Sequence, residues 1–155
     1  MSEQDFPLQE PEVPAISFHS EKIDFSLADE NAETAWLRKL IEKEGCRLKM
    51  LNYIFCTDDY LYHINLEYLN HDTLTDIITF PYSDPPIIEG DIFISLERVA
   101  ENAKTYSVSF EQELARVMAH GVLHLCGHKD KSPEEQILMR QKEEESLVLR
   151  PAFVR

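Results

Sequence analysis

The sequence predicts an α+β fold in which a small mixed sheet of about four strands is covered by helices. Its 155 residues, 43% of them hydrophobic, suffice for one globular domain with a sizeable core. Short alternating runs typical of strands occur in the first two thirds of the chain, and helical spacing dominates the last third. We therefore treat residues 1–155 as a single domain, of which about the first 13 residues are expected to be flexible.

The first predicted elements are a strand, a helix and a second strand. Residues 15–20 alternate between apolar and polar side chains, as a short strand does. Residues 27–46 have helical spacing, an acidic first turn and Gly45 at the expected C-terminal stop. Residues 47–58 alternate again, which predicts the second strand.

A helix and two short strands are predicted next. Residues 58–69 return to helical spacing. Residues 75–80 and 90–95 are short runs rich in β-branched and aromatic side chains, which indicates strands. The proline-containing residues 81–89 are expected to form the turn between them.

Three helices are predicted in the remainder of the chain. The first covers residues 96–106. The second is a long helix over residues 109–126, with Ser109 as its N-cap and a glutamine at the spacing of a capping box. The third, over residues 132–149, begins with Ser132 as N-cap and a proline at the first helical position.

Charge is distributed unevenly along the chain. The formal net charge of -14 argues against loose, non-specific nucleic-acid binding, which depends on neutralisation of phosphates by Lys and Arg. Residues 51–97 contain no Lys or Arg, whereas residues 114–131 contain more basic than acidic side chains. This second segment is a basic island, made of Arg116, Lys129 and Lys131.

The apolar runs and the cysteines indicate the compartment. The apolar runs are too short to cross a membrane, and the acidic, proline-containing N-terminus is unlike a signal peptide. Cys46, Cys56 and Cys126 are an odd set without C-x-x-C spacing, so no disulfide framework is expected. These features predict a cytoplasmic protein with free thiols and no membrane partner.

The segment HGVLHLCGHKD, residues 120–130, has the spacing of a metal site. His120 and His124 are four residues apart on the long helix, so their side chains project from one face. Gly127 can adopt the left-handed conformation that ends a helix, which lets the chain fold back toward the pair. Asp130 then supplies the third ligand, as in sites with the spacing His-x-x-x-His-x-x-Gly-x-x-ligand. The sequence thus places a metal site at the end of the long helix.

Two further features define the kind of site. Three protein ligands with an open fourth position are typical of catalytic zinc, and His128 lies two positions too early to be the third ligand. An isolated pair of histidines at this spacing is more often a packed or surface pair, but Gly127 and Asp130 favour the metal site. Gly121 stands where zinc peptidases have a glutamate base, so peptide hydrolysis is not expected. That glycine either opens space beside the metal or permits close packing.

The residues HGVLHLCG resemble the H-G-x-L-H-L-x-G core of the YbeY family, which are bacterial metal-dependent endoribonucleases. LNHDTLTDIITFPY and GDIFIS resemble that family's D-x-P-T-D-V-L-S-F segment and G-D-I strand, so the resemblance covers about residues 66–130. It implies a metal-dependent hydrolase domain with one divalent ion. Zinc is the expected metal, and other divalent metals are alternatives. The implied substrate is single-stranded ribosomal RNA in rRNA processing, and the implied partners are the ribosome or ribosomal proteins.

Two positions depart from the pattern of this family. Asp130 stands where the family has a third histidine, which leaves two histidines and one carboxylate. Leu69 stands where the family has an arginine that takes part in catalysis. Arg116 lies on the metal-binding face of the long helix and could replace that arginine, with His120 as the other catalytic residue. The alternative is a solvated Arg116 paired with Glu113 one turn back.

Other polar residues near these motifs carry weaker signals. His71 could transfer protons in a cleft, but an exposed loop histidine is the interpretation we favour. Thr75 and Asp76 are expected to set the turn into the next strand rather than to touch RNA. We expect His128 to be exposed and Cys126 to lie in the core.

The sequence leaves three functional hypotheses open. The first is a metal-dependent endoribonuclease that acts on single-stranded ribosomal RNA. The second is a ribosome-assembly binding protein that keeps the metal for stability without cleavage, as the absent family arginine suggests. The third is a non-haem iron oxygenase, because two histidines and one carboxylate also bind Fe(II), but the family resemblance argues against it.

Overall fold

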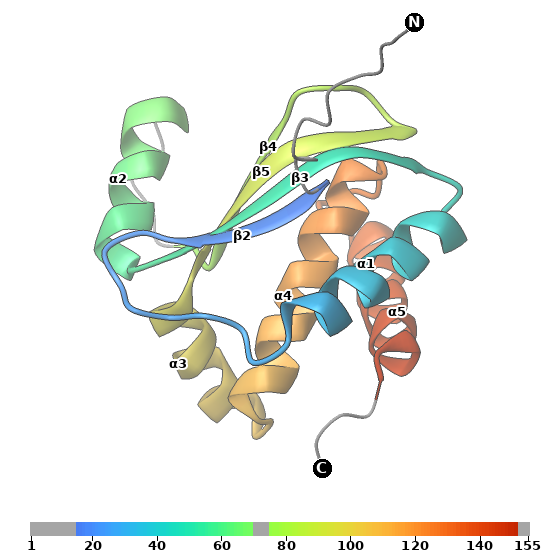
Figure 1. The fold of residues 1–155 in the computed structure, drawn as a ribbon. Helices are drawn as coiled ribbons and strands as arrows, with labels where there is room; N and C mark the ends of the chain where they lie inside the picture. Colours follow the sequence, from blue (N-terminus) through green and yellow to red (C-terminus); the bar gives the residue numbers. More distant parts are fainter. Residues whose placement is uncertain (1–14, 70–74, 152–155) are drawn as a thin grey trace, which may run out of the picture.

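A computed structural model describes residues 15–69 and 75–151 of the chain. These residues form a mixed four-stranded sheet and five helices, which confirms the predicted α+β class. Most of the helices gather against one face of the sheet (Figure 1). None of the helices in these two ranges combines the length and apolar character that a membrane crossing requires.

The four strands are arranged in the order β2, β3, β5, β4. Strand β2 (Ile16–Ser20) pairs in parallel with β3 (Arg47–Cys56), and β3 pairs in parallel with β5 (Ile87–Ser95). Strand β4 (Ile77–Pro81) is antiparallel to β5 and forms one edge of the sheet. One antiparallel pair beside two parallel pairs makes the sheet mixed, as predicted.

Polar caps define where most of the helices begin. Ser109 and Ser132 accept hydrogen bonds from the backbone N–H groups three residues later, as predicted. Glu135 completes the capping box at Ser132, where both reciprocal hydrogen bonds are present. The helices are α1 (Glu30–Lys43), α2 (Asp58–Leu69), α3 (Leu96–Tyr106), α4 (Phe110–Leu125) and α5 (Pro133–Leu149).

Two apolar clusters lie on opposite faces of the sheet. On one face, buried side chains such as Tyr53 and Ile92 join those of α1 and α4 in the main core. On the other face, Phe93 of β5 and Ile78 of β4 lie opposite each other and pack with Leu61 of α2. This follows from strand alternation, because neighbouring residues of β5 point to opposite faces.

Strand β5 begins earlier than the sequence predicts. Residues 87–89, expected to be part of a turn, pair with β3, where Ile87 lies opposite Arg47 and Ile88 lies opposite Leu48. Ile88 is fully buried, so burial in the core extends the strand up to the prolines. The turn between β4 and β5 is correspondingly shorter than predicted.

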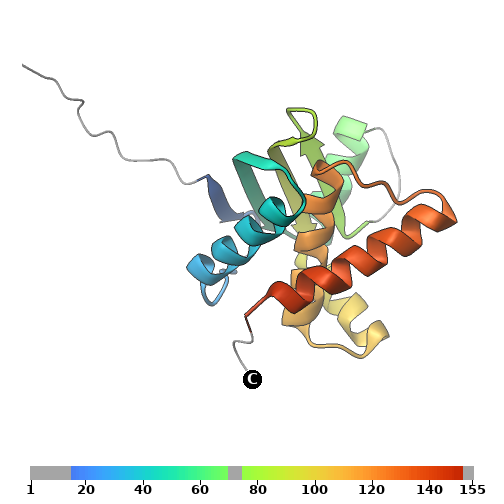
Figure 2. The same cartoon turned by 90° about the vertical axis from the view of Figure 1, so that its right-hand side faces the viewer.

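Helix α4 packs between the sheet and α5 (Figure 1 and Figure 2). A Cβ atom added at Gly121 would lie 2.7 Å from Cδ1 of Ile92 and 3.1 Å from Cδ1 of Ile77. The sequence left two roles open for Gly121, and the structure supports close packing, here against side chains of the sheet. This approach fixes the distance of α4 from β4 and β5.

Helix α5 is tied to α1, far away in the sequence. The indole Nε1 of Trp36 donates a hydrogen bond of 2.8 Å to the backbone carbonyl of Ser146. Just beyond α5, Arg150 Nη2 lies 2.7 Å from Oε2 of Glu33. Because α1 holds α5 at two points, the inward face of α5 has a defined position against α4.

Candidate metal centre

The C-terminal end of α4 carries the two predicted histidine ligands. The helix ends at Leu125, and Gly127 has a left-handed φ of 106°, as its predicted role requires. The N–H groups of Gly127 and His128 donate to the carbonyls of His124 and Leu123 over 2.9 and 3.0 Å. The chain therefore turns back over the last turn of the helix.

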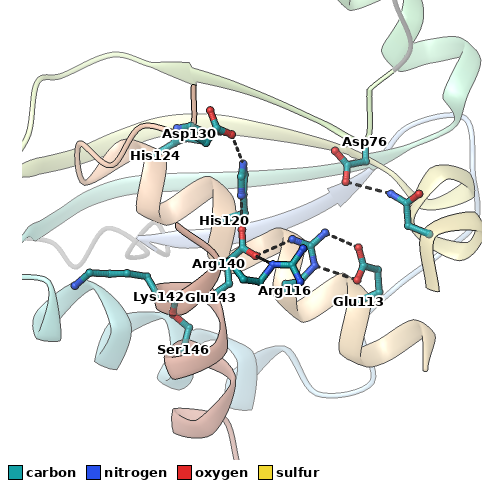
Figure 3. A network of polar contacts seen from close by, with 11 residues as sticks. Asp76, Glu113, Arg116, His120, His124, Asp130, Arg140, Lys142, Glu143 and Ser146 are labelled. Carbon is teal, nitrogen blue, oxygen red and sulfur yellow. Dashed lines mark hydrogen bonds and ion pairs between the residues drawn. The ribbon is translucent and has the colours of Figure 1, made fainter. Parts of the chain in front are cut away.

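This reversal brings Asp130 to the two histidines (Figure 3). Oδ2 of Asp130 lies 3.2 Å from Nε2 of His124 and 3.4 Å from Nε2 of His120. One ligand atom of each residue lies within 4.8 Å of the others. The predicted set of His120, His124 and Asp130 is thus brought together, and we refer to it as the metal cluster.

The spacing of the metal cluster suits a small divalent ion. Zinc binds histidine nitrogen and carboxylate oxygen at about 2.0–2.2 Å, which separates two tetrahedral ligand atoms by about 3.3 Å. The distances of 3.2 and 3.4 Å from Asp130 to the two imidazoles agree with this value. The donor set therefore fits the metal that the motif predicts.

His128, predicted to be exposed, instead forms a partly buried hydrogen bond with a glutamate. Its Nε2 lies 2.7 Å from Oε1 of Glu44, and 23% of its side chain is exposed. Lys142 of α5 lies 3.2 Å from the other carboxylate oxygen of Glu44. Burial opposes ionisation of Glu44, but the hydrogen bonds from His128 and Lys142 outweigh it and lower its pKa. His128 is therefore bound away from the metal cluster.

A groove of about 870 Å³ opens beside the metal cluster, and all three cluster residues line it. Its other walls come from β4, the turn after β4 and the end of α2. Lys129 and Lys131 are exposed and line the groove, as the predicted basic island requires. Arg116 does not belong to the described residues that line it. The basic part of the groove is thus smaller than predicted.

Arg116 lies in a polar network between α4 and α5 (Figure 3). Its Nη2 and Nε donate to Glu113 over 2.6 and 3.0 Å, which is the pairing that the alternative interpretation predicted. Its Nη1 also donates to Oε1 of Glu143 on α5 over 2.8 Å. With 20% of its side chain exposed, Arg116 is more buried than the solvated arginine of that interpretation.

Glu143 links this network to the metal cluster. Its Oε2 lies 2.5 Å from Nδ1 of His120, and only 3% of its side chain is exposed. Burial alone would raise the pKa of Glu143, but the contacts with His120 and Arg116 outweigh burial and lower it. For Arg116, burial opposes the charge, whereas Glu113 and Glu143 stabilise it and raise its pKa.

Our sequence interpretation did not include Glu143. A signal for it exists, because Met139, Glu143 and Ser146 share the inward face of α5 at helical spacing, and all three are buried. An acidic residue on such a face needs a partner. The partner could not be read from α5 alone.

Two other predicted residues lie at the turn into β4. Thr75 exchanges hydrogen bonds with the backbone of Ile77, and the carbonyl of Asp76 accepts one from Ser95, as predicted for this turn. The Asp76 side chain also lines the groove, and its burial raises its pKa, against the opposing charges of Arg116 and His120. Leu69 lines the groove as well, and His71 lies outside the described residues.

The cysteines agree with the predicted thiol state. All three are free, and none belongs to the metal cluster. Cys56 is buried, whereas Cys46 and Cys126 are half-buried against the main core. Cys126 therefore lies at the border of the core rather than within it.

A sequence model of the family described as Endoribonuclease YbeY matches residues 15–149. The chain belongs to the YbeY family. The YbeY match extends over every described strand and helix, and so includes both the metal cluster and Glu143. The resemblance that the HGVLHLCG motif indicated is thereby confirmed.

Relatives in the YbeY family cover nearly the same part of the chain. An Endoribonuclease YbeY from Flavobacterium johnsoniae is 55% identical over 134 residues, which are 86% of this chain and 96% of the relative. One from Amoebophilus asiaticus is 51% identical over 129 residues, 83% of this chain and 88% of the relative. The solution structure of TM1509 from Thermotoga maritima is similar with a TM-score of 0.59 at 27% identity, over 86% of this chain and 89% of that one.

Proposed function

We propose that this chain is a metal-dependent endoribonuclease that cleaves single-stranded segments of ribosomal RNA during ribosome maturation. One observation carries the proposal: the metal cluster lies on the wall of an open groove in a chain of the YbeY family. The relatives from Flavobacterium johnsoniae and Amoebophilus asiaticus are endoribonucleases by name. Phosphodiester hydrolysis is the chemistry that such a site and such relatives have in common.

In this proposal His120, His124 and Asp130 hold one divalent ion, which we take to be zinc. When bound, the ion supplies Lewis acidity, which polarises a phosphoryl oxygen and lowers the pKa of water. Three protein ligands leave a further position for substrate or water, as in other catalytic zinc sites. The three side chains differ in exposure but all line the groove, so RNA can reach them from that side.

The charges around the groove favour weak and local RNA binding. A net charge of -14 repels a polyanion at long range. Lys129 and Lys131 are the cations that the groove offers among its described residues, so few phosphates are neutralised. A groove of about 870 Å³ has the size of a small-ligand site, which suits a few unpaired nucleotides better than a double helix.

A second candidate function is a metal-stabilised ribosome-assembly protein without nuclease activity. Leu69 lines the groove at the position where the family resemblance predicts an arginine. The described lining residues include lysines but no arginine. For both functions we place the chain with the ribosome in the cytoplasm, in keeping with its free thiols.

The test combines metal analysis with an RNA cleavage assay on the full chain. Circular single-stranded RNA, a matching RNA duplex and ribosomal RNA are incubated with protein before and after treatment with a chelator. We expect one zinc ion per chain, cleavage of the circle but not the duplex, and loss of cleavage with chelator that added zinc restores. A zinc-loaded protein that binds ribosomes and leaves all three RNAs intact would favour the assembly protein.

A further inference from the structure

The polar network between α4 and α5 reaches the metal cluster through one side-chain contact. Nδ1 of His120 lies 2.5 Å from Oε2 of Glu143, and Nε2 of the same ring lies 3.4 Å from Oδ2 of Asp130. An imidazole that binds a metal through one nitrogen carries its proton on the other, where it needs an acceptor. Glu143 lies in the position of that acceptor.

We propose that Glu143 is a positioning residue for metal binding, which fixes the orientation and the tautomer of His120 so that Nε2 faces the metal. The inference rests on the proposed metal-dependent function. It makes α5 a part of the metal site, although α5 supplies none of the three ligands.

Glu143 can act in this way because its own position is fixed. Nη1 of Arg116 donates to Oε1 of Glu143 over 2.8 Å, which leaves Oε2 for His120. Arg116 is fixed in turn by the two oxygens of Glu113, of whose side chain only 2% is exposed. A planar guanidinium with bidentate contacts has little freedom to rotate, so the carboxylate that it holds has little freedom too.

The same contacts give Arg116 a role that differs from the catalytic one predicted from the sequence. Its Nε, Nη1 and Nη2 all donate to buried carboxylates. Arg116 is not among the described residues that line the groove. Arg116 is therefore a second positioning residue, which acts on the metal cluster through Glu143. Its positive charge also compensates the buried charges of Glu113 and Glu143.

A matched pair elsewhere in the chain provides the control. His128 and Glu44 are also a histidine and a carboxylate 2.7 Å apart, with only 8% of the Glu44 side chain exposed and Lys142 on its other oxygen. This pair contains the same three kinds of group but none of the proposed metal ligands. A change at Glu44 therefore tests the loss of a histidine-bound carboxylate as such.

The experiment measures the Zn²⁺ affinity of the full chain by competition with a chromophoric chelator, without RNA. Glu143→Gln preserves the size of the side chain and should lower the affinity about 10–100-fold, the usual effect of losing a partner of a metal-bound histidine. Glu44→Gln should change the affinity by less than about twofold. Thermal unfolding of the metal-free proteins shows whether each variant folds.

Three results would overturn the inference or its basis. A folded Glu143→Gln with the parent's affinity overturns it, and so does an equal loss of affinity in Glu44→Gln. A parent protein that binds no Zn²⁺ overturns the proposed function instead, so the two failures are distinguishable.

A second variant tests the inference independently of whether Glu143→Gln folds. Arg116→Lys keeps the charge but loses the planar fork, so it should lower Zn²⁺ affinity on the order of tenfold. It should also change the visible absorption of bound Co²⁺, which reports ligand geometry at the metal. Parent affinity together with an unchanged Co²⁺ spectrum in Arg116→Lys overturns the link through Glu143.

Discussion

Among the described residues, two histidine–glutamate pairs lie near the end of α4, and they are used differently. In the first, Glu143 takes Nδ1 of His120 and leaves Nε2 directed at Asp130. In the second, Glu44 takes Nε2 of His128, the nitrogen that would otherwise be available at the tip of the ring. Glu143 is buried and Glu44 is half-buried, and both have a cation on their second oxygen.

The difference shows that the contacted nitrogen, more than the kind of partner, decides what a histidine can do. A carboxylate on Nδ1 orients the ring and keeps Nε2 for a metal. A carboxylate on Nε2 occupies that nitrogen and makes the histidine a link between elements, here between the end of α4 and the end of α1. Substitutions on the two sides should therefore differ in their effects on metal affinity, stability and RNA binding.

The largest difference in Zn²⁺ affinity is expected between a substitution next to the first pair and a substitution in the second pair. Asp130→Ala removes a proposed ligand and should lower Zn²⁺ affinity well beyond the about 10–100-fold expected for a partner of a ligand. His128→Ala should leave the affinity close to that of the parent. Chelator competition measures both. If His128→Ala alone empties the site, His128 rather than Asp130 is the third ligand.

Gly121 precedes the first pair's neighbour His124 on α4 and follows His120, so a substitution there should affect the packing of α4 beside His120. We expect it to leave the contact between His128 and Glu44 intact. Gly121→Ala puts a Cβ at 2.7 Å from Ile92 Cδ1, and such overpacking costs about 1–3 kcal/mol. The better helix propensity of alanine returns up to about 1 kcal/mol. We expect a net loss of about 1–2 kcal/mol in the free energy of unfolding in urea.

Removal of the clashing atom provides the control for Gly121→Ala. Ile92→Val lacks Cδ1, so it should cost less stability in the Gly121→Ala background than in the parent. Strictly additive effects of the two substitutions would mean that the contact between Gly121 and Ile92 does not limit the position of α4.

The pair of His128 and Glu44 should stabilise the chain in a pH-dependent way. Because the folded chain lowers the pKa of Glu44 from 4.5, its contribution is present above that pH and is lost as pH falls through the folded pKa. Metal-free Glu44→Gln should therefore be less stable than the parent at pH 7, by about 1–2 kcal/mol. Urea unfolding between pH 7 and pH 3.5 should show this gap closing below pH 4.5. A gap that stays constant to pH 3.5 would contradict the ionic role of Glu44.

The smallest effect concerns RNA binding on the two sides of the site. Lys129→Ala and Lys131→Ala should each make the salt dependence of single-stranded RNA binding shallower, by about 0.7 in the slope of log K against log salt. Arg116→Lys should leave that slope unchanged, because Arg116 contacts carboxylates rather than the groove. Fluorescence anisotropy at several salt concentrations gives the slopes. A shallower slope in Arg116→Lys would place its side chain against RNA.

Local spacing in the sequence was enough to predict the metal cluster around His120. His120, His124 and Gly127 lie within eight residues of one helix end, where the helical repeat and a left-handed glycine fix their geometry. The caps Ser109 and Ser132 were predictable for the same reason. Asp130 is found by the same count, since little chain separates it from the helix.

Contacts between distant segments could not be predicted in this way. Glu143 and Glu44 meet His120 and His128 only because α5 and the end of α1 pack beside α4. Nothing in the residues around His128 indicates a partner 84 positions away, so exposure was the natural expectation. The early start of β5 has the same origin, because Ile87 joins the strand through its pairing with Arg47.

The hydrogen bond from Trp36 to the carbonyl of Ser146 has a consequence for the order in which the protein is made. Synthesis proceeds from the N-terminus at about 5–20 residues per second, and a domain folds as a unit once its segments are available. The loop with the metal cluster emerges before Glu143, and α5 reaches its place only when α1 is there to receive it. A nascent chain that has reached Asp130 thus has all three proposed ligands but lacks the carboxylate that orients the first of them. In the proposed role of Glu143, full metal affinity therefore requires that α5 has been translated and docked beside α4.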